Sequence, residues 1–240
     1  MSEQNDPSAQ KVALVQAALM HVVFDGWSDT TLEAAAQDCG IEVDAARALF
    51  PRGGVDLALA FHAWGDAQLR AKLEAEDLSE MRIREKVTHA VRARLELISP
   101  HKEAVRRGTT LFALPVYAPE GARAIWQTAD TIWTALGDPS DDLNWYTKRS
   151  ILAGVYSATV LYWLGDHSAE DEATWEFLDR RIGNVMQFEK IKARVNDNPF
   201  LKPLLTVPNF FAQRVRAPSQ GRNSDLPGYW DENAQGGSAS

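Results

Sequence analysis

Residues 31–52, TLEAAAQDCGIEVDAARALFPR, have the pattern of a helix-turn-helix. Small and apolar residues over 32–38 predict a short helix, and Cys39-Gly40 predicts the turn after it, because glycine favours the position beyond a helix C-terminus. A second short helix is predicted over 43–50, where Pro51 ends the pattern. The stretch therefore predicts two short helices joined by a tight turn, an arrangement that many proteins place in the major groove of DNA.

The charge of this stretch argues against DNA binding. Residues 28–60 carry six acids and two bases, a net charge of −4, within a chain of net charge −8. Glu42 and Asp44 lie at the start of the second helix, the end that enters the groove in DNA-reading proteins. Carboxylates there would face phosphates, whose neutralisation supplies most non-specific affinity. These two acids also suit the helix dipole, and neither interpretation restores DNA binding.

The rest of the chain has helical periodicity, with apolar residues three and four apart and no sustained alternation. Residues 141–164 are apolar on nearly every side, which is typical of a helix inside a core. The predicted fold class is all-α, with a helix-turn-helix part over 1–52 and a helical body over 53–188. Other helices are predicted over 8–24, 55–76, 80–98, 100–113, 119–137 and 141–164, before a ninth helix.

Residues 189–216 differ in character from the body. Bulky apolar residues alternate there with six bases and two acids, which suits an interface with anionic lipid. Three prolines would divide the segment into short pieces, and a helix docked on the body is the alternative. Residues 217–240 are predicted to be disordered. The predicted membrane-contacting residues are Phe200, Leu201, Lys202, Leu204, Leu205, Phe210, Phe211 and Arg214.

Signatures of catalysis are missing from the sequence. The five histidines show no ligand spacing of a helical di-iron site. A lone Cys39 excludes an internal disulfide, and no phosphate-binding loop or nucleophile motif occurs. We therefore expect a protein that is not an enzyme and that holds neither metal nor cofactor. The first ten residues lack a targeting pattern, and no apolar run is long enough to span a membrane.

Two resemblances follow from these elements. A leading helix, a helix-turn-helix, a long fourth helix and an all-helical body resemble the TetR-type repressors, in which the body holds an apolar ligand. Residues 109–185 resemble the ubiquinone-biosynthesis lipid-binding accessory family, the ninth Coq family. The most specific match is DLNWYTKR over 142–149, supported by Leu114-Pro115 and by TWEFLDRRI over 174–182.

The second resemblance implies a function. Such proteins bind isoprenoid lipids or quinone precursors, form dimers and assist a di-iron hydroxylase at a membrane surface, without reading DNA. The implied lipid-binding residues are Leu111, Phe112, Leu114, Trp126, Asp130, Trp133, Tyr156 and Trp163. The implied partner-binding residues are Ile132, Trp145, Tyr146 and Arg149.

Several alternatives remain open at this point. Aromatic and aliphatic residues on helices are usually core, and Trp145 or Tyr146 could pack inward, since adjacent helical side chains point about 100° apart. A TetR-like regulator sensing an apolar ligand and an enzyme acting on quinone intermediates are the other functions considered. The expected location is the cytoplasmic face of a bacterial inner membrane, or the matrix side of a mitochondrion in a eukaryote.

Overall fold

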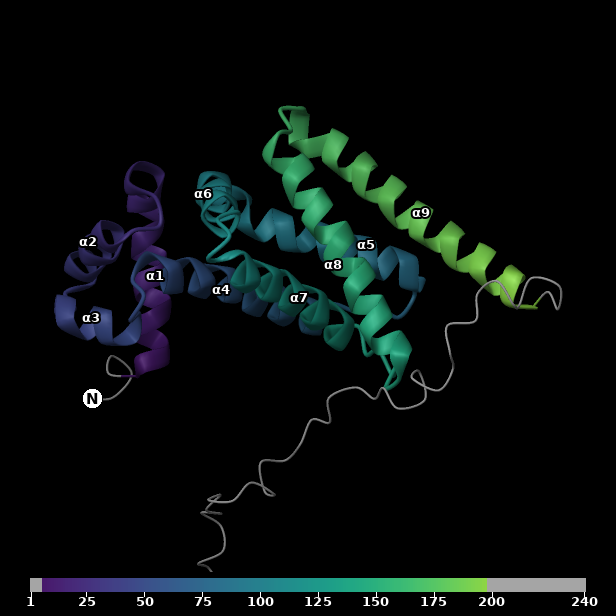
Figure 1. Ribbon diagram of the computed structural model, residues 1–240, viewed down its shortest axis with the longest axis horizontal. Helices are drawn as coiled ribbons and strands as arrows, with labels where there is room; N and C mark the ends of the chain where they lie inside the picture. The colour runs from purple at the N-terminus through teal and green to yellow at the C-terminus, as the bar shows by residue number, and fades with distance from the viewer. Residues whose placement is uncertain (1–5, 198–240) are drawn as a thin grey trace, which may run out of the picture.

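The computed structural model describes residues 6–197, and their side chains as far as residue 185. Within this range the chain forms helices joined by short connections and no strand, which confirms the all-α fold class (Figure 1). The helices are α1 (Pro7–Asp25), α2 (Asp29–Cys39), α3 (Val43–Leu49), α4 (Gly54–Ala75), α5 (Ile83–Ile98), α6 (Lys102–Phe112), α7 (Ala118–Ala135), α8 (Leu143–Leu164) and α9 (Glu172–Asp197). Single 3-10 turns occupy Ser99–His101 and Ala169–Asp171.

The head, which we define as α1 to α3, contains the predicted helix-turn-helix. Ser28 caps α2, because its Oγ accepts a hydrogen bond from the backbone N–H of Thr31 at 3.2 Å. Gly40 ends the helix with a φ of +64°, a left-handed conformation that glycine adopts without steric cost. Local sequence therefore fixes both ends of α2, and the two-helix prediction is confirmed.

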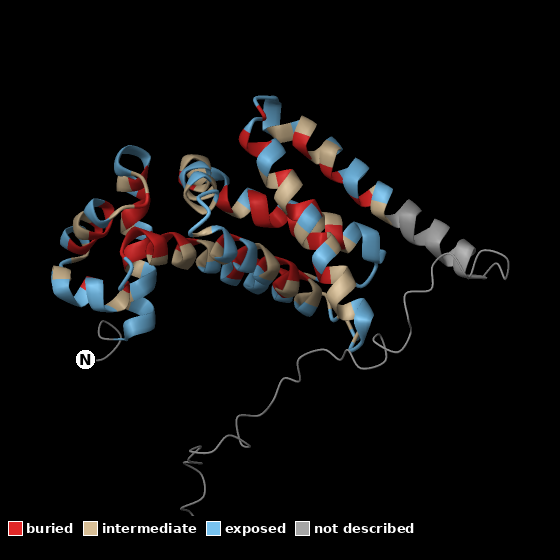
Figure 2. Ribbon diagram, viewed as in Figure 1, coloured by how far each residue is buried: buried red, intermediate tan, exposed pale blue. Residues whose placement is uncertain are grey.

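The core of the head is continuous with the core of the body. Trp27, between α1 and α2, is buried, and its ring centroid lies 5.4 Å from that of Phe61 on α4. Its Nε1 donates a hydrogen bond to the backbone oxygen of Ala104 on α6 at 2.9 Å. Figure 2 shows buried residues running from the head along α4 into the body. The head and the body therefore share one hydrophobic cluster, and residue 52 lies in the connection between α3 and α4.

The body is built around α8, which packs against α7 and α9, while α4 packs against α5 and α7 (Figure 1). The last helix, α9, continues to Asp197, so the predicted change of character at residue 188 falls inside a helix. The predicted membrane residues, from Phe200 to Arg214, lie outside the described part of the chain. Among the helices that the structure describes, none is long and apolar enough to cross a bilayer.

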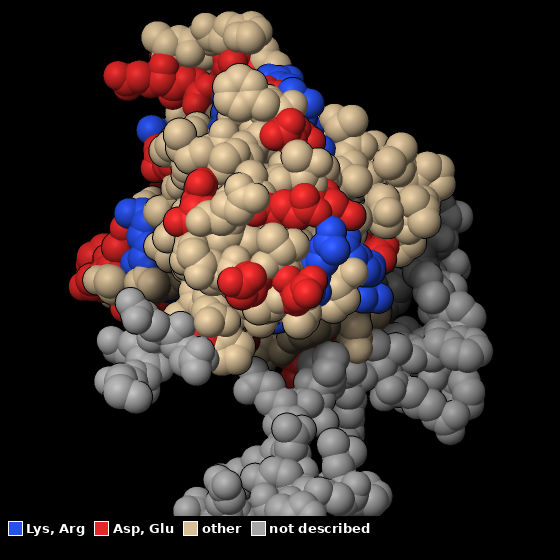
Figure 3. Space-filling view, turned by 90° about the vertical axis from the view of Figure 1, so that its left-hand side faces the viewer, with Lys and Arg blue, Asp and Glu red and all other residues tan. Residues whose placement is uncertain are grey.

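Acidic side chains are spread over the outer face of the head, with bases in smaller groups (Figure 3). Both arginines of the helix-turn-helix stretch are ion-paired. Arg47 donates to Glu33 at 2.6 Å, and Arg52 contacts both Asp56 and Glu120 at 2.8 and 2.9 Å. Because carboxylates already neutralise these two guanidinium groups, they would contribute little to binding DNA phosphates. This agrees with the negative net charge of the stretch.

Candidate functional site

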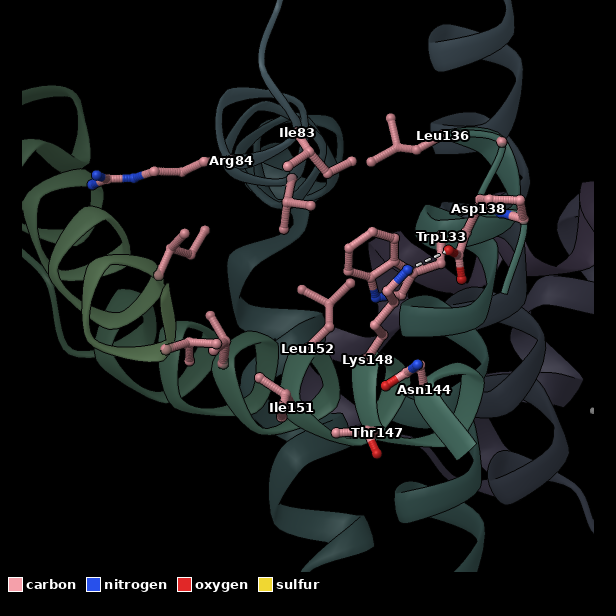
Figure 4. Close-up of a pocket in the computed structure, with 16 residues that line it drawn as sticks. Ile83, Arg84, Trp133, Leu136, Asp138, Asn144, Thr147, Lys148, Ile151 and Leu152 are labelled. Carbon is pink, nitrogen blue, oxygen red and sulfur yellow. Dashed lines mark hydrogen bonds and ion pairs between the residues drawn. The ribbon is translucent and has the colours of Figure 1, made fainter. Parts of the chain in front are cut away.

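An apolar cavity of about 510 Å³ lies between the start of α5, the end of α7, the first half of α8 and α9 (Figure 4). We call it the first cavity. Its size is in the range of pockets that bind small molecules or part of a lipid tail. It is lined by Ile83, Arg84, Val87, Trp133, Leu136, Gly137, Asp138, Pro139, Asn144, Thr147, Lys148, Ile151, Leu152, Val155, Ile182 and Val185.

The turn between α7 and α8 creates one wall of this cavity. Gly137 follows α7 with a φ of +71°, and its N–H donates to the Thr134 carbonyl at 3.0 Å. Asp142 then begins α8, where its Oδ1 accepts from the Asn144 N–H at 2.8 Å. Because the chain reverses within this short turn, the end of α7 and the first turns of α8 face the same space.

Asp138 forms the polar end of the first cavity. Its Oδ1 accepts hydrogen bonds from Lys148 Nζ at 2.7 Å and from Ser140 Oγ at 2.9 Å, and its Oδ2 accepts from Arg149 Nη1 at 3.1 Å. Burial opposes ionisation of the carboxyl group, but the hydrogen bonds from Lys148, Ser140 and Arg149 outweigh it and hold the pKa of Asp138 below its ordinary value.

We expect Asp138→Asn to lower the free energy of unfolding by about 1–3 kcal/mol at pH 7, because charged hydrogen bonds to a buried group are lost. A carboxyl group with a lowered folded pKa stabilises the protein fully above its unfolded pKa of about 3.9. That contribution disappears as the pH falls through the folded pKa. Urea unfolding at several pH values should therefore show a gap between wild type and variant that narrows in acid. A gap independent of pH would contradict this assignment.

Trp133, which lines the first cavity, has a buried polar atom without a hydrogen bond to any described residue. Its indole Nε1 is buried and has no hydrogen-bond partner among the described residues. The ammonium of Lys148 lies 5.3 Å from the centre of its ring, a cation–π contact (Figure 4). A buried donor without a partner is costly to the folded protein.

The predicted lipid-binding residues are divided among different places. Trp133 lines the first cavity, whereas Phe112 and Tyr156 line a second cavity on another side of α8. The other five line neither cavity. Leu111 packs against the core, Leu114 is exposed, Trp126 belongs to a surface aromatic cluster, Asp130 pairs with Arg149, and Trp163 is fully buried.

Sequence reasoning missed most of the first cavity's apolar wall. Ile151 and Val155 are four residues apart on α8, so helical spacing alone could have placed both on one face. No local signal joins that face to Val87 on α5 or Ile182 on α9, because only tertiary packing brings these helices together.

The predicted partner-binding residues do not form one exposed patch. Ile132 is fully buried, because α7 packs against both α4 and α8. Arg149 is 2 % exposed and is held by Asp130 at 2.5 Å and by Asp138. The prediction that Ile132 and Arg149 contact a partner directly is therefore wrong, because neither side chain reaches the solvent. Each could influence a partner only by positioning the residues around it.

Two predicted partner residues do lie near the surface. Trp145 and Tyr146 are both half-buried, with ring centroids 4.8 Å apart. Trp126 on α7 lies 6.1 Å from Trp145, and the guanidinium of Arg149 lies 3.9 Å from the centre of the Trp145 ring. We call these three rings the aromatic cluster. Arg149 thus makes a cation–π contact with Trp145 of the aromatic cluster and an ion pair with Asp138 at the first cavity.

No three histidine, cysteine or acidic side chains within the described residues are grouped as metal ligands would be. Three of the histidines make separate polar contacts instead, and His62 is the one that contacts Thr128, at 2.8 Å. His21 contacts Asp38 at 2.7 Å, and His89 contacts Glu76 at 2.6 Å. The most distinctive features of the described part of the chain are its apolar cavities and the aromatic cluster.

Known proteins similar in sequence to this chain belong to one family. The COQ9 family model matches residues 118–189, which span α7, α8 and most of α9. The mitochondrial ubiquinone biosynthesis protein COQ9 of Rattus norvegicus is 34 % identical over 180 residues, covering 72 % of this chain and 57 % of the rat protein. The Homo sapiens protein is 32 % identical, with 72 % and 56 % covered. The chain thus spans a little over half the length of these relatives.

Among solved structures, a TetR transcriptional regulator from Nitrosomonas europaea has a similar fold. The TM-score is 0.60, with 72 % of this chain and 96 % of the regulator covered. The sequence identity is 18 %, so the likeness concerns the fold alone. It confirms the TetR-like architecture predicted from the order of helices.

Proposed function

The chain carries a COQ9 domain over residues 118–189, and from this we propose that it takes part in ubiquinone biosynthesis as a non-catalytic lipid-binding protein. The observation that carries the proposal is the first cavity, whose walls come chiefly from α7, α8 and α9, the helices of that domain. Its ligand would be an isoprenoid lipid or quinone precursor.

The walls of the first cavity suit an isoprenoid chain. Branched aliphatic surface comes from Leu136, Ile151, Leu152, Val155 and Ile182, and the charged groups of Asp138 and Lys148 are paired with each other at one end. Burial of each methylene group contributes about 0.8 kcal/mol, so a few isoprene units give substantial affinity. A cavity of about 510 Å³ encloses only part of a polyprenyl chain. The remainder would lie along the surface or in a membrane.

The aromatic cluster supports the second part of the proposal, a protein partner. Large half-buried rings held by an arginine are typical of residues that dominate protein interfaces. Trp126 lies within α7, and Trp145 and Tyr146 lie on the first turn of α8, whose first half also lines the first cavity. A partner bound to the aromatic cluster would therefore be close to the exposed end of the ligand. We propose that this partner is the di-iron hydroxylase that acts on the quinone precursor.

The remaining parts of the proposal concern the setting. Residues 189–216 would hold the protein at an anionic membrane surface, with two copies forming a homodimer. The relatives are mitochondrial by name, which favours the mitochondrial location over the bacterial one. The alternative of a DNA-binding regulator has less support, because the bases of the helix-turn-helix stretch are paired with acids.

Filling the first cavity tests the proposal. Ile151 is half-buried in its wall, so we expect Ile151→Trp to occupy the space of the ligand. The variant should retain about one tenth or less of the wild-type content of isoprenoid lipid, measured by mass spectrometry of extracts from the purified full chain. Its affinity for added ubiquinone-2 should fall by a similar factor.

Ala122→Phe is the matched control, because Ala122 is an exposed residue that lines the second cavity instead. This variant should keep the wild-type lipid content. Both variants should show the wild-type helical circular dichroism. Equal lipid content in Ile151→Trp and wild type, or wild-type protein free of isoprenoid lipid, would refute the proposed function.

A further inference from the structure

The loop between α6 and α7 exposes a run of apolar side chains. Its sequence over residues 113–118 is ALPVYA, which contains no charged residue. Leu114 is 48 % exposed and Val116 is 69 % exposed, and the other residues of the loop are exposed except Tyr117, which is half-buried. Leu114 was predicted to bind lipid, but it lines neither cavity. A continuous apolar run on the surface of a folded protein indicates a contact surface.

The apolar surface continues from this loop to the opening of the second cavity. That cavity measures about 370 Å³ and lies between the head, α4, α6, α7 and α8. Most of its lining residues are buried or half-buried, but Ala113, Ala118, Ala122 and Leu161 are exposed and therefore mark its opening. All four side chains are aliphatic. We call residues 113–118, Ala122 and Leu161 together the loop surface.

The backbone of this loop is already hydrogen-bonded within the protein. The N–H groups of Tyr117 and Ala118 both donate to the Leu114 carbonyl oxygen at 2.9 Å. Those of Ala113 and Leu114 donate to carbonyl oxygens of α6 at 3.0 and 3.2 Å, and Pro115 has no N–H to satisfy. An unpaired N–H is costly in hydrocarbon, so these hydrogen bonds lower the cost of moving the loop from water into lipid.

Positive charge lies beside the loop surface. Residues 102–123 carry four bases and two acids, a net charge of +2, in a chain of net charge −8. On α6, Arg106 and Arg107 share one carboxylate, that of Glu103, at 3.2 and 3.0 Å. Because one acid cannot neutralise two guanidinium groups, a surplus of positive charge remains next to the loop. This surplus complements the anionic head groups of a membrane.

The exposed apolar residues of the head lack this combination. Met20 and Phe24 on α1 are 73 and 81 % exposed. The helices of the head, over residues 7–49, carry six acids and two bases, however. An anionic membrane would repel that surface, so charge favours the loop surface over α1 as a place of membrane contact.

We propose that residues 113–118 enter an anionic lipid bilayer and form a second membrane contact, separate from residues 189–216. A bilayer fits better than a protein partner, because so short a loop offers far less than the roughly 800 Å² that each partner buries in a stable protein interface. The half-buried ring of Tyr117 suits the interfacial region, where tyrosine is enriched. The inference rests on the membrane setting of the proposed function, but it is independent of the ligand in the first cavity.

A fluorescent label on the loop tests this contact in the full chain. Cys39 is the single cysteine, so Cys39→Ser/Val116→Cys carries one nitrobenzoxadiazole label. We expect its emission to rise and to shift to shorter wavelength when vesicles of phosphatidylcholine and phosphatidylserine are added, because the label leaves water. Unlabelled Leu114→Asp/Val116→Asp should bind the same vesicles about tenfold more weakly than wild type, or weaker still, because two apolar contacts with lipid are lost.

Leu143 provides the matched control. It is 47 % exposed, nearly the same as Leu114, and it begins α8, beyond the opposite end of α7 from the loop (Figure 1). The label on Cys39→Ser/Leu143→Cys should keep its emission when vesicles are added, and Leu143→Asp should bind vesicles as wild type does. All variants should keep the wild-type helical circular dichroism.

Three results would overturn the inference. They are an unchanged emission at residue 116, an equal change at residues 116 and 143, and vesicle binding that Leu114→Asp/Val116→Asp leaves intact. Failure of the proposed function would show instead as purified chain without isoprenoid lipid, which the labels do not measure. The two failures are therefore distinguishable.

Discussion

Asp66→Ala is expected to lower the free energy of unfolding by about 3–5 kcal/mol, because it leaves the buried guanidinium of Arg94 without a counter-ion. Arg94 is 1 % exposed and cannot turn to solvent without disrupting the core. The substitution also removes the acceptor of the Thr128 hydroxyl at 2.9 Å. Urea unfolding followed by circular dichroism measures the loss.

The double variant Asp66→Ala/Arg94→Met separates charge from packing. Replacing a whole buried ion pair by apolar residues is often neutral or stabilising, so the double variant should recover most of the loss caused by Asp66→Ala. Glu33→Ala serves as the control, because its pair with Arg47 lies on the surface and such pairs contribute little. If Asp66→Ala and Glu33→Ala unfold at the same urea concentration, the interpretation of Arg94 as a buried, charge-dependent residue is wrong.

Gly54→Ala is expected to lower the free energy of unfolding by about 2–3 kcal/mol, although alanine is the better helix former. A Cβ at residue 54 would lie 2.3 Å from the carbonyl carbon and oxygen of Trp27 and 2.4 Å from the Ser28 nitrogen. All three are backbone atoms, which cannot rotate away as a side chain can. The connection between α1 and α2 would have to move away from α4.

Gly154→Ala on α8 is the matched control, because nothing lies within 4 Å of its Cβ position and the residue is exposed. This change should stabilise the protein by about 0.5–1 kcal/mol through helix propensity. Thermal unfolding of both variants gives the comparison. Equal shifts of the two midpoints would show that the contact between head and body does not depend on Gly54.

Most helices could be predicted because residues within a short stretch of sequence determine where each helix begins and ends. Gly40 and Gly137 adopt positive φ after helices, and Ser28 and Asp142 cap the helices that follow. The aromatic pair Trp145 and Tyr146 could also be recognised, since two large rings near a polar helix start are unusual. These features depend on neighbours within a few residues, which is the range over which sequence patterns are informative.

The two cavities could not be predicted in the same way. A periodic pattern shows that residues such as Trp133 and Tyr156 share an apolar character, but not that α8 places its two sides against different spaces. The buried polar pair was missed because Asp66 and Arg94 lie 28 residues apart on different helices. No local signal indicates that Gly65 leaves room for a guanidinium.

The sequence by itself determined the order of helices, the helix-turn-helix and its acidic character, and the resemblance to COQ9, because these depend on local hydrogen bonding, periodicity and residue identity. Only the tertiary structure decided which apolar residues are core and which line a cavity. It also decided that Ile132 and Arg149 are buried and that Arg94 forms a buried ion pair with Asp66. These properties arise from contacts between helices distant in the chain, where packing leaves space in some places and fills it in others.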